Sequence, residues 1–195
     1  MIKTKNDYNY YLEADKRALR INHRRPRLVL DEIWKFERLL RKLEYYENCK
    51  NSIFWKPYYY FLYFRFHRAQ IKMGFNIYPN SFGPGLSISH PGTIIVNPAA
   101  RIGSNCRIHD CVVIGTNARD NNQVPTIGNN IYIGPGAKIF GKIYIADGIA
   151  IGANSVVNKS FYEKNISIAG VPARKISQKG SKGIIIEETS LINEK

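Results

Sequence analysis

The sequence predicts a mainly β protein, a parallel β-helix built from hexapeptide repeats and preceded by an α-helical segment. Two observations support this. An isoleucine returns every six residues through most of the second half of the chain. Near residue 74, apolar residues spaced three and four apart give way to short β-branched units separated by Gly, Asn and Pro. We therefore expect helices over 1–73, the β-helix over 74–178 and a tail over 179–195.

The helical segment is predicted from one apolar stripe, which is typical of a helix that packs against a partner. Pro26 suggests the start of that helix, and Asp31 with Glu32 falls in an early turn, where the helix dipole favours negative charge. The stripe consists of Leu28, Val29, Ile33, Phe36, Leu39, Leu40 and Leu43.

Residues 53–68 form an aromatic stretch that Lys56, Pro57 and Arg65 interrupt. A membrane span needs about 20 apolar residues, so this stretch is not expected to cross a bilayer. It is expected to pack against the rest of the protein or another subunit. Contact with a membrane surface is the alternative, because aromatic side chains beside Lys and Arg suit the interface.

The repeat fits a solenoid, because a period of six matches neither the 3.6 of a helix nor the 2 of a strand. The isoleucines should stack as an interior column, with small residues at the corners. One gap measures 13 residues, so part of 118–126 must leave the coil, and we expect this loop to form one wall of a substrate site. The units begin at Ile102, Ile108, Ile114, Ile127, Ile133, Ile139, Ile145 and Ile151.

Charge and cysteines limit the classes of function. The net charge of +14 suits an anionic partner or a solvated basic face, and no zinc-finger spacing or RNA-binding aromatic signature favours nucleic acid. Cys49, Cys106 and Cys111 have neither a CxxC spacing nor an even count, so neither a disulfide framework nor a metal site is expected. With no apolar leader after Met1, we expect a cytoplasmic protein, or one peripheral at the inner face of the membrane.

Four strings resemble the hexapeptide-repeat acyltransferases, in the branch that contains serine acetyltransferases and capsular or exopolysaccharide O-acetyltransferases. They are residues 85–96 (GLSISHPGTIIV), 125–141 (PTIGNNIYIGPGAKIFG), 151–157 (IGANSVV) and 169–174 (AGVPAR). The resemblance covers about half of the chain. It implies a left-handed β-helix, a homotrimer, and acetyl-CoA bound in the groove between adjacent subunits.

His90 is the predicted general base. Transfer of an acetyl group to a hydroxyl needs a group that takes the hydroxyl proton, and histidine suits this near neutral pH. His90 matches the catalytic histidine of the family, and His109 is either a second site residue or a surface ring. The resemblance places Asn76 where the serine enzymes have an aspartate partner for the histidine, although an amide stabilises imidazolium less than a carboxylate does.

The acceptor is predicted to be a sugar hydroxyl in capsular, exopolysaccharide or O-antigen synthesis. The serine enzymes resembled here hold the amino acid with charged groups, where this chain has Ser89 and Gln123 with Val124. An unpaired zwitterion is costly, and Ser89, Asn121, Asn122 and Gln123 suit sugar hydroxyls. The alternatives are serine O-acetylation in cysteine synthesis and a β-helix that acts only as an oligomerisation module.

The resemblance also assigns residues to the co-substrate, acetyl-CoA. Small residues that let pantetheine approach the coil are Gly134, Ala137 and Ala153. Cations that could pair with the phosphates of CoA are Lys159, Arg174 and Lys175. Alternatively, Gly134 is present only because the corner of the coil needs a glycine. For Arg174 and Lys175, the alternative is that they belong to an ordinary basic tail.

Overall fold

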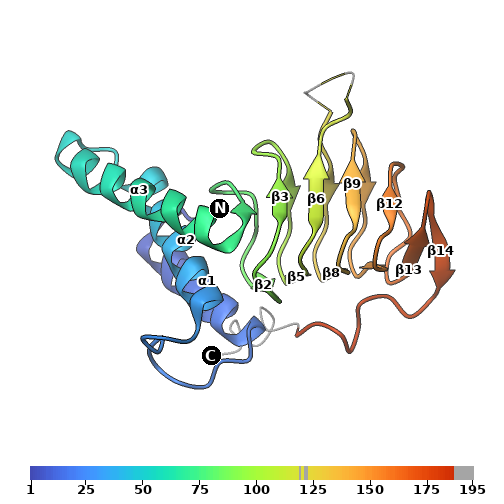
Figure 1. Ribbon diagram of the computed structural model, residues 1–195, viewed down its shortest axis with the longest axis horizontal. Helices are drawn as coiled ribbons and strands as arrows, with labels where there is room; N and C mark the ends of the chain where they lie inside the picture. The colour runs from blue at the N-terminus through green and yellow to red at the C-terminus, as the bar shows by residue number, and fades with distance from the viewer. Residues whose placement is uncertain (119, 121–122, 187–195) are drawn as a thin grey trace.

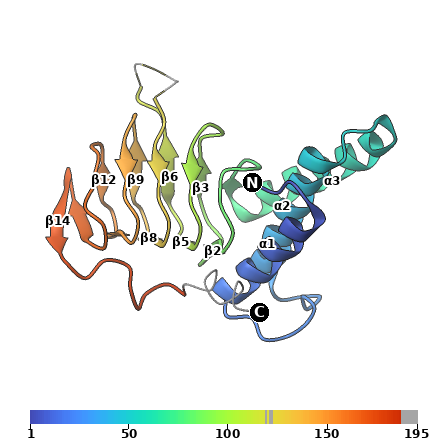
Figure 2. The same ribbon diagram turned by 180° about the vertical axis from the view of Figure 1, so that it is seen from behind.

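A computed structural model describes residues 1–118, 120 and 123–186. Figure 1 shows two parts side by side: a group of helices from the first part of the chain, and a stack of short strands that extends away from it. Figure 2 shows the same arrangement from behind, with β2 nearest the helices and β14 at the far end of the stack. The predicted order, helices and then a β-helix, is confirmed.

The helical part consists of α1 (Lys5–Ala18), α2 (Glu32–Cys49), the single 3-10 turn η1 (Ile53–Trp55) and α3 (Lys56–Met73). The sequence explains where α1 begins, because Thr4 and Asp7 form a capping box that satisfies backbone N–H groups on both residues. Gly74 ends α3 in the left-handed region, with φ of 77°.

The predicted start of the second helix was wrong. It begins at Glu32 instead of near Pro26, and Leu28 and Val29 lie before it with exposed side chains. The carboxylate of Asp31 accepts hydrogen bonds from the backbone and the guanidinium of Arg27, which holds residues 27–31 in a turn. This local bonding competes with helix formation.

The strands are short and belong to three sheets that run the length of the coil. Pairing is parallel throughout, except that β13 and β14 close the far end as an antiparallel pair. One sheet has the order β1-β3-β6-β9-β12, the second β10-β7-β4, and the third, sheet C, β14-β13-β11-β8-β5-β2. This is the predicted mainly β, left-handed β-helix class, which the structural neighbours described below also support.

The strand bounds are as follows: β1 Phe75–Asn76, β2 Ser87–Ile88, β3 Ile94–Val96, β4 Arg101–Ile102, β5 Cys106–Ile108, β6 Val112–Gly115, β7 Thr126–Ile127, β8 Ile131–Ile133, β9 Lys138–Phe140, β10 Tyr144–Ile145, β11 Ala150–Ile151, β12 Val156–Val157, β13 Ser167–Gly170 and β14 Ala173–Ser177.

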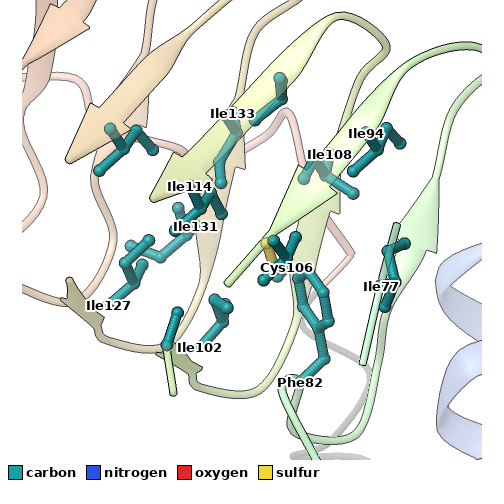
Figure 3. Close-up of a cluster of buried hydrophobic side chains, with 14 of the residues drawn as sticks. Ile77, Phe82, Ile94, Ile102, Cys106, Ile108, Ile114, Ile127, Ile131 and Ile133 are labelled. Atoms are coloured by element: carbon teal, nitrogen blue, oxygen red, sulfur yellow. The ribbon is translucent and has the colours of Figure 1, made fainter. Parts of the chain in front are cut away.

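The interior of the coil is filled by the isoleucine column that the repeat predicts. All eight repeat isoleucines are buried, from Ile102 to Ile151, and each lies in register with an isoleucine of a neighbouring coil, as Ile108 does with Ile133. Figure 3 shows Ile108, Ile114, Ile131 and Ile133 pointing into this shared interior, with Phe82 and Ile77 at the end nearest the helices.

Arg41 of α2 joins the helices to the first coil. Its guanidinium is fully buried, pairs with Asp15 of α1 at 2.7 Å and Glu44 at 3.0 Å, and donates to the carbonyl oxygens of Phe82 and Gly83. In turn, Asp15 accepts from the N–H groups of residues 85 and 86. Backbone groups that a further coil would have satisfied are therefore satisfied by side chains of the helices.

The aromatic stretch has two different sides. Leu62 and Phe66 are buried against α2, where Phe66 stacks on Phe36 with ring centroids 5.3 Å apart. The outer side of α3 is exposed in the single chain, so the expected packing holds for only part of the stretch. None of the helices in the described ranges is long and apolar enough to cross a bilayer.

The described part of the predicted tail packs against the coil. Ser181 is buried, donates from its backbone to Gly148 and from its hydroxyl to the carbonyl of Asn130. The chain after β14 thus returns along a corner of the coil, as Figure 1 shows beneath the strands.

Candidate active site

The candidate site begins where β2 leaves sheet C. Ile88 points into the core with 1% exposure, so alternation along the strand sends Ser89 outward, and His90 follows in an exposed bend. Gly92, with φ of 144°, donates its N–H to the carbonyl of Met73, which closes this bend against the end of α3. His90 is therefore held on a tight turn and is open to solvent.

The next coils bring His109 and Tyr132 toward Ser89 and His90. The N–H of Ser89 donates to Ile108 and that of His109 donates to Ile133, so Ser89 and His109 lie one coil apart in line. Ser89 Oγ is 3.2 Å from His109 Nε2. The His109 ring lies 5.9 Å from that of His90 and meets the Tyr132 ring edge-on at 5.3 Å, centroid to centroid. The structure thus brings His90, Ser89 and His109 together.

The environment of His109 favours its neutral form. Partial burial lowers its pKa most, electrostatic interaction with Arg107 and then with the neighbouring imidazole lowers it further, and the carboxylate of Asp110 opposes this. The neutral ring has one donor and one acceptor nitrogen, so it can share a hydrogen bond with Ser89 in either tautomer. His109 can therefore orient groups at the site without adding a charge beside His90.

Arg107 and Asp110 are charged residues of this patch that the sequence analysis missed. Arg107 is outward on β5, between Ser87 and Tyr132 in the strand register. Asp110 lies against the His90 turn, since a Cβ added to Gly92 would be 2.9 Å from the Asp110 Cβ. For Arg107 the signal was present in the repeat, since a residue next to an inward isoleucine must face outward. Asp110 lies beyond β5 in a turn, where the strand alternation makes no prediction.

The remaining predicted catalytic and acceptor residues are not all near His90. Asn76 lies on β1, exposed on another sheet, and none of the described hydrogen bonds joins it to His90; it lines a cavity of about 350 Å³ with Tyr63, His67 and Tyr78. Asn121 and Asn122 fall outside the described residues. The amide of Gln123 donates to Asp120 Oδ2 at 3.1 Å, so it is engaged within its own loop.

The predicted cofactor residues extend from His109 along sheet C. In the register, Gly134 and then Gly152 follow His109 on the next coils. The row of outward side chains therefore continues as a strip of surface without side chains. A Cβ on Gly134 would lie 2.8 Å from the backbone N of Ala153, so contact between coils already requires this glycine. Ala137 is completely buried and its methyl group cannot line a surface, whereas Ala153 is exposed.

The predicted phosphate-binding cations lie at the far end of the coil. Lys159 is exposed, with its ammonium 5.5 Å from the centre of the Phe161 ring. Arg174 and Lys175 are exposed on β14, at the end of sheet C, and Lys175 pairs with Glu163 at 2.5 Å. The strip therefore has an imidazole at one end and cations at the other, separated by about four coil spacings of about 4.8 Å each.

No family model matches the chain. Two curated relatives are serine acetyltransferases: that of Synechococcus elongatus is 32% identical over 116 residues, covering 58% of this chain and 47% of the relative. That of Buchnera aphidicola is 33% identical over 118 residues, covering 59% of this chain and 43% of the relative. This chain thus spans about half the length of the curated relatives it matches.

Solved structures show the same likeness over most of the chain. Serine acetyltransferase from Brucella abortus in complex with coenzyme A superposes with a TM-score of 0.71 at 27% identity, covering 90% of this chain and 70% of that one. The Neisseria gonorrhoeae enzyme in complex with serine gives 0.67 at 25% identity, covering 89% and 70%. Together the likenesses support the hexapeptide-repeat acyltransferase family. The members named here are serine acetyltransferases.

The sugar acceptor was the wrong prediction, because the curated relatives and the structural neighbours are serine acetyltransferases. That prediction relied on neutral side chains thought to be free for sugar hydroxyls. Ser89 is instead within hydrogen-bond reach of His109 and Gln123 is bonded to Asp120. It also overlooked the charges of Arg107 and Asp110, which lie beside the histidines.

Proposed function

We propose that this chain transfers the acetyl group of acetyl-CoA to the hydroxyl of serine, with His90 as the general base. The observation that carries the proposal is the exposed His90 beside the Ser89 and His109 pair, at one end of a strip that leads to exposed cations. The serine acetyltransferase likenesses support both the donor and the acceptor.

In this mechanism His90 accepts the proton of the serine hydroxyl as its oxygen attacks the thioester carbonyl. His90 then returns the proton to the sulfur of CoA as the carbon–sulfur bond breaks. The same residue therefore acts first as base and then as acid. The neutral ring of His109, held beside Ser89, lines the acceptor side and excludes bulk water from it.

Arg107 and Asp110 are our candidates for binding the charged ends of serine. A guanidinium suits a carboxylate, and a carboxylate suits an ammonium group. Neither side chain has a hydrogen bond or ion pair within the described part of the chain that would occupy its charge. This removes the objection that a zwitterion would find no charged partner here.

The first test is release of CoA thiol from acetyl-CoA in the presence of L-serine. We expect His90→Ala to lower kcat by about 100-fold or more, the usual contribution of a general base. His67→Ala, which removes an exposed histidine of α3, is the matched control and should retain full activity. Serine-dependent turnover that persists in His90→Ala would contradict the assignment of the base.

The second test separates acceptor binding from donor binding. Arg107→Gln and Asp110→Asn should each raise the KM for serine about tenfold or more, as loss of one charged contact does, and leave the KM for acetyl-CoA unchanged. Arg101→Gln, on another face of the coil, is the control. Equal effects on both KM values would place the two residues outside the acceptor pocket.

We also propose that the chain forms a homotrimer and works in the cytoplasm. Ala153, Arg174 and Lys175 lie open on a single chain, and a neighbouring subunit would provide the second wall of the strip. The free cysteines suit a reducing compartment. Light scattering of the purified protein measures the molar mass, and a value of one chain would contradict the trimer.

A further inference from the structure

The outer face of α3 and η1 carries exposed apolar side chains that no function above uses. The apolar residues of this aromatic face are Phe54, Trp55, Tyr60, Phe61, Phe64 and Ile71. Phe54 is 87% exposed, Phe64 is 62% exposed and Ile71 is 66% exposed. Because Tyr60, Phe64 and Ile71 are spaced at i, i+4 and i+11, they lie on one stripe of the helix.

The aromatic face is not the side of α3 that packs against the other helices. The opposite side of α3 is already packed: Leu62 and Phe66 are at most 1% exposed, and Tyr46 of α2 meets Tyr58 at 4.9 Å between ring centroids. Figure 1 shows α3 projecting away from the coil, with the η1 end farthest from the strands. The aromatic face can therefore meet a broad surface without obstruction by the β-helix.

Cations that flank the aromatic face outnumber the carboxylates near them. Residues 48–109 contain no Asp or Glu, and α3 itself carries Lys56, Arg65, Arg68 and Lys72. Lys72 reaches Glu32 of α2 at 3.5 Å, and the Arg65 guanidinium lies 5.8 Å from the centre of the Phe61 ring. Within the described ranges, neither Arg68 nor Lys56 forms an ion pair.

We propose that the aromatic face and its flanking cations bind the surface of an anionic phospholipid bilayer. Tyr and Trp rings prefer the boundary between headgroups and hydrocarbon, Phe and Ile side chains can enter the hydrocarbon, and Arg and Lys can pair with lipid phosphates. A second copy of the face fits less well, since it would bring two sets of excess cations together. This binding is independent of the proposed acetyl transfer.

The experiment is flotation of the full chain with lipid vesicles. We expect it to float with vesicles of equal parts phosphatidylglycerol and phosphatidylcholine and to remain behind with pure phosphatidylcholine. Binding should also protect the exposed Trp55 from acrylamide quenching, whereas the buried Trp34 is protected in both states.

Variants test the face and its charges separately. Phe61→Ser with Phe64→Ser, and Arg65→Gln with Arg68→Gln, should each weaken binding to the anionic vesicles about tenfold or more. Two controls remove the same chemistry elsewhere: Arg24→Gln with Arg25→Gln, and Tyr162→Ser, which is 74% exposed on the coil. The controls should bind within about twofold of the unmodified chain.

Three outcomes would overturn the proposal: no flotation with anionic vesicles, equal flotation with both lipids, or an equal loss in the controls. A face that instead binds a second copy would reveal itself by a lower molar mass of Phe61→Ser with Phe64→Ser in lipid-free solution, with vesicle binding unchanged. Thiol release by all these variants should equal that of the unmodified chain, whichever way the acetyl-transfer proposal is decided.

Discussion

Glu37 and His90 are titratable side chains in opposite surroundings. His90 is exposed, as our proposal of a general base requires. Glu37 of α2 is fully buried, accepts from the N–H of Ile88 at 3.0 Å, and has no partner for its second oxygen. Burial raises the pKa of Glu37 well above its usual range, and the negative charge of Asp15 raises it further.

We expect Glu37→Gln to stabilise the protein, and more so at high pH. A raised pKa in the folded state means that the folded chain binds more protons than the unfolded chain above the usual value for glutamate. Stability is then lost as pH rises from that value through the folded pKa. Glutamine keeps the acceptor for Ile88 and cannot ionise.

Urea unfolding at pH 5 and pH 8 checks this. The midpoint advantage of Glu37→Gln over the unmodified chain should be larger at pH 8 than at pH 5. The control is Glu47→Gln on the same helix, where the carboxyl is only partly buried and a smaller difference is expected. An advantage that does not depend on pH would show that Glu37 is ionised in the folded state.

At the scale of elements, the junction between α2 and the coil depends on Arg41. A buried ion pair is weak evidence for net stabilisation, because desolvation offsets its attraction. Removing one partner is different, since it leaves charges buried without compensation. Asp15 and Glu44 would be left in this state, and the carbonyl oxygens of Phe82 and Gly83 would lose their donor.

Arg41→Met should therefore lower the free energy of unfolding by about 3 to 5 kcal/mol, the usual cost of breaking a buried pair. Arg38→Met on the same helix is the matched control, because Arg38 only lies over the Trp34 ring, and we expect a change below about 1 kcal/mol. Chemical denaturation followed by circular dichroism measures both. Equal losses would mean that the helix, and not the ion pairs, responds to loss of charge.

At the scale of the whole molecule, the coil depends on close contact between successive turns. Gly134 shows this most clearly, because an added Cβ would lie 2.8 Å from the backbone N of Ala153 and 2.9 Å from the carbonyl oxygen of Ile151. Both neighbours are backbone atoms, which cannot turn aside as a side chain can. The coils would have to separate, and each lower coil is held by the one above it.

Gly134→Ala should destabilise the protein by about 1 to 3 kcal/mol, as overpacking does. Gly115→Ala is the matched control, because the nearest atom to the added Cβ within the described residues would be Val113 Cγ1, at 3.8 Å. We expect a change within about 0.5 kcal/mol. Thermal unfolding of both variants measures the difference. Similar midpoints would show that the coils relax around the extra methyl group.

The sequence was most informative where one local period governs the structure. The isoleucine repeat predicted the coil and its interior column, and the capping residues at Thr4 and Gly74 agree with the ends of helices. It failed at Leu28 and Val29, where bonds between Asp31 and Arg27 replace helix. It named His90, Ser89 and His109 as candidate site residues but could not pair Ser89 with His109, which are 20 residues apart.

By itself the sequence determined the β-helix and its place after a helical segment, because a six-residue return of an apolar side chain is a local property. Only the tertiary structure decided which outward side chains share a patch, since that depends on the offset between coils, and the insertion after Ile114 changes this offset. It also decided that Arg41 closes the end of the coil and that one side of α3 stays exposed, because both depend on how the helices pack against the first coil.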